Sequence, residues 1–361
     1  MKRSGDVSEW KVLVFVPGDG PDYEVEGIWV HHFQMKWMPS NIFPFIFEKC
    51  NQASFLMALE RVGVDVQEVK ICHGNTAEFS IYPNAVKKLN PNCLTLLHHH
   101  DLSSFGFAQG RLRNAKWYRF IQSFFLRKRH REIDCHVFIS TVARMHFIED
   151  SNWTPRWSYI LHNGVNIDLF TRGSVSHHKI GSVFTIGTIG NILKDGVKDF
   201  PCIARAFAKL VSRVASLSNN PKVCWKIVGS GNGMEALKRL ISDLGIQKYV
   251  DFVPEMDHNQ LPRFYQSLDL FVLPSWWEGF GCVYTEAYAC GVPFIACSEN
   301  NGIVDLAPGD WLIKAHDAIA LFNKMHSMYR MREDDLQPLL PLKGEYRILP
   351  LVDRFLEGLK I

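Results

Sequence analysis

Short apolar runs alternate with helical segments throughout the C-terminal half of the chain, and this alternation constrains the fold more than any other feature. The predicted strands are 183–189, 223–228, 250–253, 270–273 and 294–296, and the helices that connect them are 200–215, 234–244, 261–266 and 283–290. Strands joined through helices pair in parallel, because the chain crosses back before the next strand begins. The pattern therefore predicts an α/β fold with parallel sheets.

The N-terminal half repeats this pattern less regularly. Strands are predicted over 11–16, 64–71, 94–97 and 135–139, with helices over 51–62 and 114–131, whereas residues 22–47 carry no assignable pattern. The alternation breaks once, near 160–180. Because the chain has 361 residues and a domain has about 150, the break predicts two α/β domains, 1–165 and 166–335, with a cleft between them.

Composition limits where such a chain works. The uninterrupted apolar runs, such as 12–16, are far shorter than the roughly 18 residues that a membrane-spanning helix needs. The N-terminus is basic, but that run is too short and too late for a secretory signal. The nine cysteines are scattered without a CxxC pair, which favours reduced thiols over disulfides or a zinc site. We therefore expect a cytoplasmic protein without a metal.

The net charge of +3 comes from one basic segment, 111–131, which contains eight Lys and Arg residues and no carboxylate. A single basic segment on an otherwise mildly acidic chain argues against a nucleic-acid-binding protein. Apolar residues such as Trp117 and Phe124 gather on one side of the predicted helix, and basic residues gather on the other. Two interpretations remain open: a core helix with a solvated basic face, or a patch for an anionic membrane surface.

The segment 273–293 concentrates chemistry-bearing residues. A strand ends at Leu273, and a loop then presents Glu278, followed by glycines that let the backbone approach a ligand. A helix is predicted to start near Gly281, and its free N–H groups suit a phosphate or a sugar hydroxyl. Glu286 lies inside that helix. The segment predicts a binding site for a polar, electron-rich ligand.

These residues resemble a known family. Glu278 and Glu286, with seven residues between them inside PS-x-x-EGFG-x-x-x-x-EA, match the E-x7-E signature of the retaining GT-B glycosyltransferases of family 4, the glycosyl transferases group 1. Four other pieces follow the family order: an NGV segment at 163–165, a lysine-led helix at 198–207, a VGSG turn at 228–231 and a GIVD loop at 302–305. The resemblance runs from about 135 to 310.

The resemblance implies a GT-B fold, with two Rossmann-like domains facing across a cleft. The N-terminal domain would bind the acceptor and the C-terminal domain a nucleotide-sugar donor, UDP being the commonest nucleotide in such relatives. Residues 336–361 would form a C-terminal helix that crosses back to the N-terminal domain. The family needs no metal, because a lysine and a helix N-terminus stabilise the charge on the leaving diphosphate.

The resemblance also implies roles for individual residues. Glu286 would bind the ribose hydroxyls. The donor sugar would be held by Glu278 and by the amides of Gly279, Phe280 and Gly281. Lys198 would neutralise the diphosphate, and the base would sit near Val253.

Two parts of the family pattern differ here. The arginine that usually precedes the lysine is Asn191, and the glycine after the lysine is Asp199, so Lys194 is a candidate for the missing charge. The glycine-rich loop of the N-terminal domain is also absent, and Gly18 in Pro17–Pro21 is a loose substitute.

His98, His99 and His100 end a predicted strand. Adjacent residues on a strand point to alternate faces, so these histidines rarely converge on one metal ion. His100, before Asp101, resembles the HD pair that the family places near the sugar.

The expected activity is a retaining transfer of a hexose from a nucleotide sugar to a growing glycan or a lipid-linked acceptor. We place it in surface polysaccharide or lipopolysaccharide synthesis, in the cytoplasm or at the inner face of the membrane. A glycosidase pair is rejected, because Glu286 lies among nucleotide-binding positions. Two alternatives remain: a non-catalytic GT-B binding subunit and a nucleotide-sugar epimerase.

Overall fold

The structure is a computed structural model that describes residues 11–25, 27–35, 48–100, 102, 124, 127–172, 183–194, 196–217, 222–333 and 341–359. The chain forms two compact units, one of residues 1–161 with 355–361 and one of residues 162–354. The division falls at 161/162, four residues before the expected one, and the second division falls inside helix α10 (Ile348–Leu359). Of the basic segment 111–131, only residue 124 and residues 127–131 lie in the described ranges. Most of the residues on which the membrane-surface interpretation depends therefore lie outside them.

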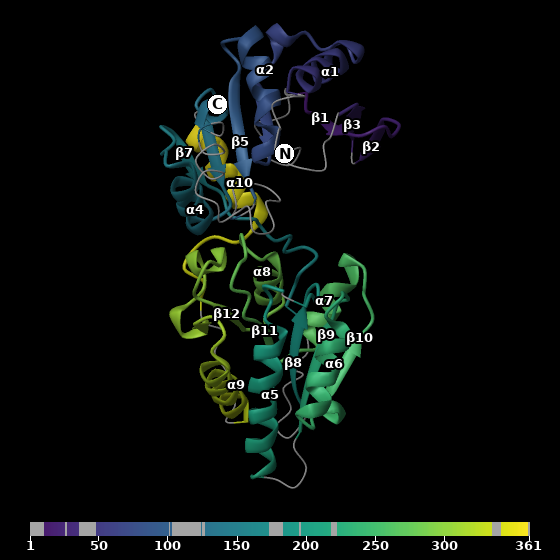
Figure 1. Ribbon diagram of the computed structural model, residues 1–361, viewed down its shortest axis with the longest axis vertical. Helices are drawn as coiled ribbons and strands as arrows, with labels where there is room; N and C mark the ends of the chain where they lie inside the picture. Colours follow the sequence, from purple (N-terminus) through teal and green to yellow (C-terminus); the bar gives the residue numbers. More distant parts are fainter. Residues whose placement is uncertain are drawn as a thin grey trace. The chain divides into compact units, whose positions relative to one another are not determined.

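The C-terminal unit is built on a six-stranded sheet of order β10-β9-β8-β11-β12-β13, in which every pair is parallel (Figure 1). The strands are β8 (Phe184–Ile189), β9 (Val223–Val228), β10 (Val250–Val253), β11 (Leu270–Leu273), β12 (Phe294–Cys297) and β13 (Leu312–Ile313). Most of their residues are buried because helices cover both faces, as a parallel sheet requires. The five strands predicted here are confirmed to within one residue at each end.

Helices cover the two faces of this sheet. Helix α5 (Phe200–Ala215) packs against α6 (Met234–Asp243) and α9 (Ala318–Glu333), whereas α7 (Leu261–Gln266) packs against α8 (Cys282–Ala289). The four predicted helices are confirmed, and α9 was not predicted. Helix α5 starts where the Asp199 side chain accepts a hydrogen bond from the Cys202 amide, 3.2 Å away, as an N-cap residue does.

The N-terminal unit contains two sheets rather than one. A parallel sheet of order β4-β5-β6-β7 comprises β4 (Ile71–Asn75), β5 (Leu94–His99), β6 (Cys135–Phe138) and β7 (Ser158–Ile160). A second sheet, of order β1-β3-β2, comprises β1 (Leu13–Pro17), β3 (Ile28–Phe33) and β2 (Tyr23–Val25), which pairs with β3 antiparallel. The helices are α1 (Glu48–Arg61), α2 (Ile81–Leu89) and α4 (Thr141–Ser151).

One strand prediction in this unit is wrong. The strand expected over 64–71 is a short 3-10 helix, η1 (Val66–Glu68), and β4 begins only at Ile71. The Asp65 side chain accepts a hydrogen bond from the Gln67 amide, 2.9 Å away, so a local cap overrides the apolar pattern. The other 3-10 helices are η2 (Ala77–Ser80), η4 (Gln247–Tyr249), η5 (His258–Gln260), η6 (Gly302–Asp305) and η7 (Gly309–Trp311).

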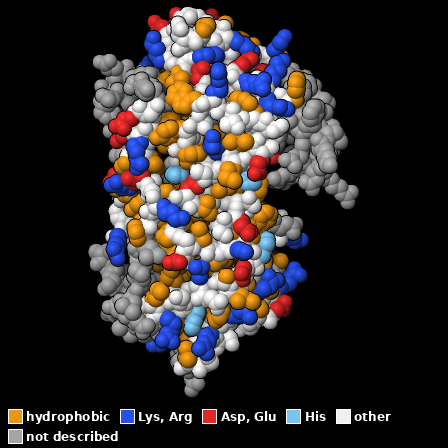
Figure 2. Space-filling model, turned by 90° about the vertical axis from the view of Figure 1, so that its left-hand side faces the viewer, with side chains coloured by type: hydrophobic (Ala, Val, Ile, Leu, Met, Phe, Trp, Pro, Cys, Tyr) orange, Lys and Arg blue, Asp and Glu red, His pale blue; other side chains and the backbone are white. Residues whose placement is uncertain are grey.

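Two negative findings apply to the described ranges. No helix there is long and apolar enough to cross a membrane, and no group of three or more His, Cys, Asp or Glu residues is arranged to hold a metal ion. Basic and acidic side chains are interspersed over the molecular face drawn in Figure 2.

The N-terminal unit buries several histidines around β5 and β6. His99 Nε2 lies 3.0 Å from His136 Nδ1, and His136 Nε2 lies 3.0 Å from the carbonyl oxygen of His130. Burial lowers the pKa of His136 to about 4 and that of His98 to about 3, from an ordinary 6.5. Burial also lowers the pKa of His99. Burial therefore favours the neutral form of these imidazoles in the folded state.

We expect this unit to lose stability as the pH falls below 6.5. The unfolded chain takes up protons there while the buried histidines do not, so each contributes a loss of about 1.4 kcal/mol per pH unit down to its folded pKa. Urea unfolding at pH 7.5 and 5.5 measures this loss. His98→Phe should reduce the difference between the two pH values. An equal difference in the wild type and the variant would contradict the account.

Candidate active site

Loops at the carboxyl ends of neighbouring strands form the candidate site. In a parallel sheet these ends lie at one edge, where open α/β folds bind ligands. The loops after β8, β9, β11 and β12 meet there. The Gly190 amide donates to the Val228 carbonyl over 3.0 Å, and the Glu278 amide donates to the Asn300 carbonyl over 2.9 Å.

Two glycines allow the first two loops to touch. A Cβ on Gly229 would lie 2.1 Å from the carbonyl oxygen of Gly190, and a Cβ on Gly190 would lie 2.4 Å from Cδ of Lys198. The Lys198 side chain therefore lies across Gly190, and any side chain at this position would displace it. The VGSG turn is thus explained by the close approach of two backbones.

Lys198 and Glu278 form an ion pair in this site. Lys198 Nζ lies 3.3 Å from Glu278 Oε2, and the Ser275 hydroxyl donates to the same oxygen over 3.4 Å. Each of the two charged side chains is 23% exposed, so the pair remains open to solvent on one side. The geometry brings together two residues that are 80 positions apart and that the sequence assigned to one site.

Buried Asn301 holds the loop that presents Glu278 through hydrogen bonds. Its amide nitrogen donates to the Ser275 carbonyl over 2.9 Å and to the Tyr284 hydroxyl over 3.1 Å, and its oxygen accepts from the Ile303 amide. The Tyr284 hydroxyl donates to the Leu273 carbonyl over 2.6 Å. Only glycine fits at Gly281, because φ is +76° and a Cβ would lie 2.5 Å from the Tyr284 ring.

Glu286 lies on α8 and is almost completely buried. Its Oε2 accepts a hydrogen bond from the Tyr265 hydroxyl, 2.8 Å away, and its Oε1 lies 3.3 Å from His258 Nε2. Burial and the adjacent carboxylate raise the pKa of Tyr265, so the phenol stays protonated and donates a hydrogen bond to Glu286. The carboxylate is therefore fixed in direction.

Backbone strain gathers around the same loops. Five non-glycine residues in the described ranges have positive φ, and three of them border this site: Asp199, Asn300 and His316. The Asp199 carboxylate lies 2.7 Å from His316 Nδ1, so two of these left-handed residues are joined to each other. Strain of this kind collects at functional sites, and Asp199 keeps the left-handed conformation that a glycine would adopt.

The remaining predicted residues of this unit lie around the pair. Phe280 is buried and stacks on His162 with 5.4 Å between ring centroids, and His162 lies 3.1 Å from the Asp305 carboxylate.

Asn191 and Lys194 are exposed, and the Lys194 amide donates to the Asn232 side chain. Val253 ends β10 and is half-buried. The Gly279 and Gly281 amides flank Phe280 at the start of α8.

His100 and Gly18 belong to the N-terminal unit. His100 Nε2 lies 2.5 Å from the Asn75 side-chain oxygen, and the Gly18 amide donates to the Phe33 carbonyl over 2.9 Å. Asp101, the expected partner of His100, lies outside the described residues.

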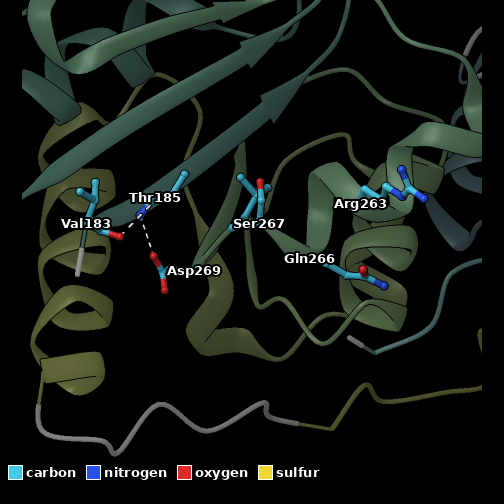
Figure 3. A pocket seen from close by; sticks show the side chains of 7 residues that line it. Val183, Thr185, Arg263, Gln266, Ser267 and Asp269 are labelled. Atoms are coloured by element: carbon cyan, nitrogen blue, oxygen red, sulfur yellow. Dashed lines mark hydrogen bonds between the residues drawn. The ribbon is translucent and has the colours of Figure 1, made fainter. Parts of the chain in front are cut away.

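A hollow of about 430 Å³ lies elsewhere on the C-terminal unit, at the amino end of β8 (Figure 3). Its lining includes Thr185 and Asp269, whose carboxylate accepts from the Thr185 amide over 2.6 Å. Asp269 also pairs with buried Arg332 at 3.0 Å. None of the predicted site residues lines this hollow. A second hollow, of about 450 Å³, is lined by Val253, Lys226 and Arg263 among others.

Sequence reasoning missed the residues that hold the charged side chains in place. Tyr265, His258, Asn301, Ser275 and His316 each contact a predicted or neighbouring site residue. Except for Ser275, which lies three residues before Glu278, these residues are distant in the sequence from the residues that they contact, so no spacing pattern reveals them.

Comparisons with known proteins support a family for this site. Residues 180–337 match the family model for glycosyl transferases group 1. The D-inositol 3-phosphate glycosyltransferase of Mycolicibacterium smegmatis is 33% identical over 168 residues, which are 44% of this chain and 36% of that protein. The chain thus spans less than half the length of this relative.

Solved structures share the fold. Sucrose-phosphate synthase from Thermosynechococcus elongatus has a TM-score of 0.70 at 17% identity, covering 98% of this chain and 89% of that one. HepE of Anabaena in complex with UDP has a TM-score of 0.67 at 17% identity, covering 92% and 86%. The solved structures confirm the α/β fold with parallel sheets, and the family match supports the glycosyl transferases group 1 for residues 180–337.

We expect the conformation at Asp199 to determine its tolerance to substitution. Asp199→Gly keeps the left-handed backbone and loses the cap, which costs only a few tenths of a kcal/mol. Asp199→Ala loses the cap and adds about 1–2 kcal/mol of left-handed strain. Urea unfolding of both variants measures the difference. Equal destabilisation by glycine and alanine would show that the left-handed conformation at this position does not lower the stability.

Proposed function

We propose that the chain is a retaining glycosyltransferase that moves a hexose from a UDP-sugar to a hydroxyl of a growing glycan or lipid-linked acceptor. The ion pair between Lys198 and Glu278, in a site built from carboxyl-end loops with Glu286 on the next helix, is the observation that carries the proposal. A cation and two carboxylates in one site suit a ligand that has both a diphosphate and sugar hydroxyls.

Each charged residue takes one part of the donor in this proposal. Lys198 and the backbone amides at the start of α8 face the diphosphate, Glu278 accepts hydrogen bonds from the hexose hydroxyls, and Glu286 accepts them from the ribose. Before the donor binds, Lys198 and Glu278 neutralise each other, so neither charge is left unpaired in a half-buried site.

The transfer needs stabilisation of the leaving group. The bond between the anomeric carbon and the diphosphate oxygen breaks, and the electron pair leaves with UDP. The acceptor oxygen bonds to the same carbon on the same face, and its proton passes to the departing phosphate oxygen. Lys198 and the α8 amides stabilise the negative charge that develops there. We assign no metal to this step, because these groups supply the positive charge.

Support for the donor and the acceptor comes from different sources. HepE, which shares the fold, binds UDP in its solved complex, and this favours UDP here. The family resemblance supports the proposed role in surface polysaccharide or lipopolysaccharide synthesis. We propose that the N-terminal unit selects the acceptor.

One observation favours a second candidate, a non-catalytic binding subunit. Asn191 stands where the family has arginine, and Lys194, the candidate replacement, is exposed beside Asn232. Such a subunit would bind a nucleotide sugar without turnover. An epimerase would instead convert the free nucleotide sugar, so product analysis separates the three activities.

Ligand-induced stabilisation tests the donor class. Binding to the native state raises its stability by about 2.7 kcal/mol at a ligand concentration of 100 times Kd. Thermal unfolding with UDP, GDP, ADP, CMP and their common sugar conjugates should show a shift with uridine ligands. The same shift in Glu286→Ala, or no shift with any nucleotide in the wild type, would contradict the proposal.

Substitutions of the two glutamates should change different kinetic constants. Glu286→Ala should raise the donor KM and Glu278→Ala should mainly lower kcat, each at least about tenfold, because a charged hydrogen bond is worth about 1.5–3 kcal/mol. Glu235→Ala, at an exposed glutamate of α6, is the matched control and should leave both constants unchanged. Steady-state kinetics with a labelled UDP-sugar measures the effects; wild-type constants in both site variants would refute the assignment.

The two lysines separate the main interpretation from the second candidate. Lys198→Ala should lower kcat/KM at least about tenfold through the lost charge. Lys194→Ala should have a comparable effect only if this lysine replaces the family arginine. An active Lys198→Ala enzyme would exclude the proposed leaving-group stabilisation.

A further inference from the structure

The two oxygens of the Glu286 carboxylate have very different partners. Oε2 accepts from Tyr265, which is fully buried among aromatic rings. Phe170, Phe264 and Phe271 surround the Tyr265 ring at centroid distances of 6.1, 6.0 and 5.6 Å. Packing against these rings holds the phenol in place, so Tyr265 keeps Oε2 occupied.

The other oxygen has an exposed partner. His258 Nε2 lies 3.3 Å from Oε1, and the His258 side chain is 61% exposed whereas that of Glu286 is 10% exposed. His258 begins the short helix η5, and its ring packs edge-on against Phe170 at 5.1 Å. Exposed contacts of this kind are weak, so the imidazole can leave Oε1 at little cost.

On the basis of the proposed function, we propose that Tyr265 is a positioning residue for Glu286 and that His258 is a placeholder on Oε1, which the ribose hydroxyls displace. The buried phenol fixes the direction of the carboxylate and leaves one oxygen for the donor. The imidazole covers that oxygen while the site is empty, so the buried carboxylate never lacks a partner.

This arrangement predicts opposite effects for the two neighbours of Glu286. Removing the phenol hydroxyl frees the carboxylate to rotate and leaves Oε2 unpaired, which weakens the contact with the ribose. Removing the imidazole takes away a competitor, which strengthens that contact. Structural damage would weaken binding in both cases.

The test is direct titration with UDP and with 2′,3′-dideoxy-UDP, which lacks both ribose hydroxyls. The wild type should bind UDP about tenfold or more tightly than the dideoxy form. Tyr265→Phe should lower this ratio severalfold, because a hydrogen bond to a charged group is worth roughly tenfold in affinity. It should also raise the donor KM, whereas kcat should stay within about twofold of the wild-type value. His258→Ala should bind UDP about two- to fivefold more tightly than the wild type, the range expected for one exposed pair.

A matched control is Tyr329→Phe, a buried tyrosine on α9 that packs against Phe184 at the opposite end of the sheet. It should leave the UDP-to-dideoxy ratio unchanged.

Four outcomes overturn the inference: two concern the roles of Tyr265 and His258, and two concern the proposed function on which the inference rests. An unchanged ratio in Tyr265→Phe would remove the positioning role. Weaker UDP binding by His258→Ala would make His258 a ligand contact instead of a placeholder. If Glu286→Gln keeps the full ratio, or the wild type does not bind UDP, the proposed function itself fails and the inference fails with it.

Discussion

Parallel pairing of β8 with its neighbours is the constraint on which the site depends. Because β8 pairs with both β9 and β11, the loops after all three strands leave the sheet at the same edge. Lys198, after β8, can then meet Glu278, after β11, although 80 residues separate them. The glycines at 190 and 229 complete this arrangement, since a side chain at 229 would push the Gly190 backbone away and a side chain at 190 would displace that of Lys198.

The charged side chains Lys198, Glu278 and Glu286 each have a partner before any ligand arrives. Lys198 neutralises Glu278, and Tyr265 with His258 supplies partners for Glu286. Half-buried charges without partners would cost several kcal/mol each, so the Lys198–Glu278 pair and the Tyr265–Glu286 hydrogen bond stabilise the empty site as well as direct its side chains. The left-handed residues Asp199, Asn300 and His316 represent stored strain in the same loops.

The sequence predicted the sheet of the C-terminal unit well because its strands are fully buried apolar runs with clear turn residues between them. The strand placed over 64–71 was wrong because the Asp65 cap forms a local 3-10 helix that an apolar pattern cannot reveal. Residues 22–47, left unassigned, include β2 and β3, whose pairing joins two short segments of mixed composition. The E-x7-E spacing identified Glu278 and Glu286, but Tyr265 contacts Glu286 from helix α7 and Asn301 holds Ser275 in the Glu278 loop from the segment after β12, and no spacing encodes such contacts.

Photolabelling with 5-azido-UDP-glucose tests the central claim most directly, because the attached peptide reports where the nucleotide binds. The account predicts a label at the carboxyl edge of the sheet, on the peptides that contain residues 229–233 or Val253–Glu255, and protection by excess UDP. A label confined to the hollow at the amino end of β8, on Thr185 or residues 266–269, would contradict it.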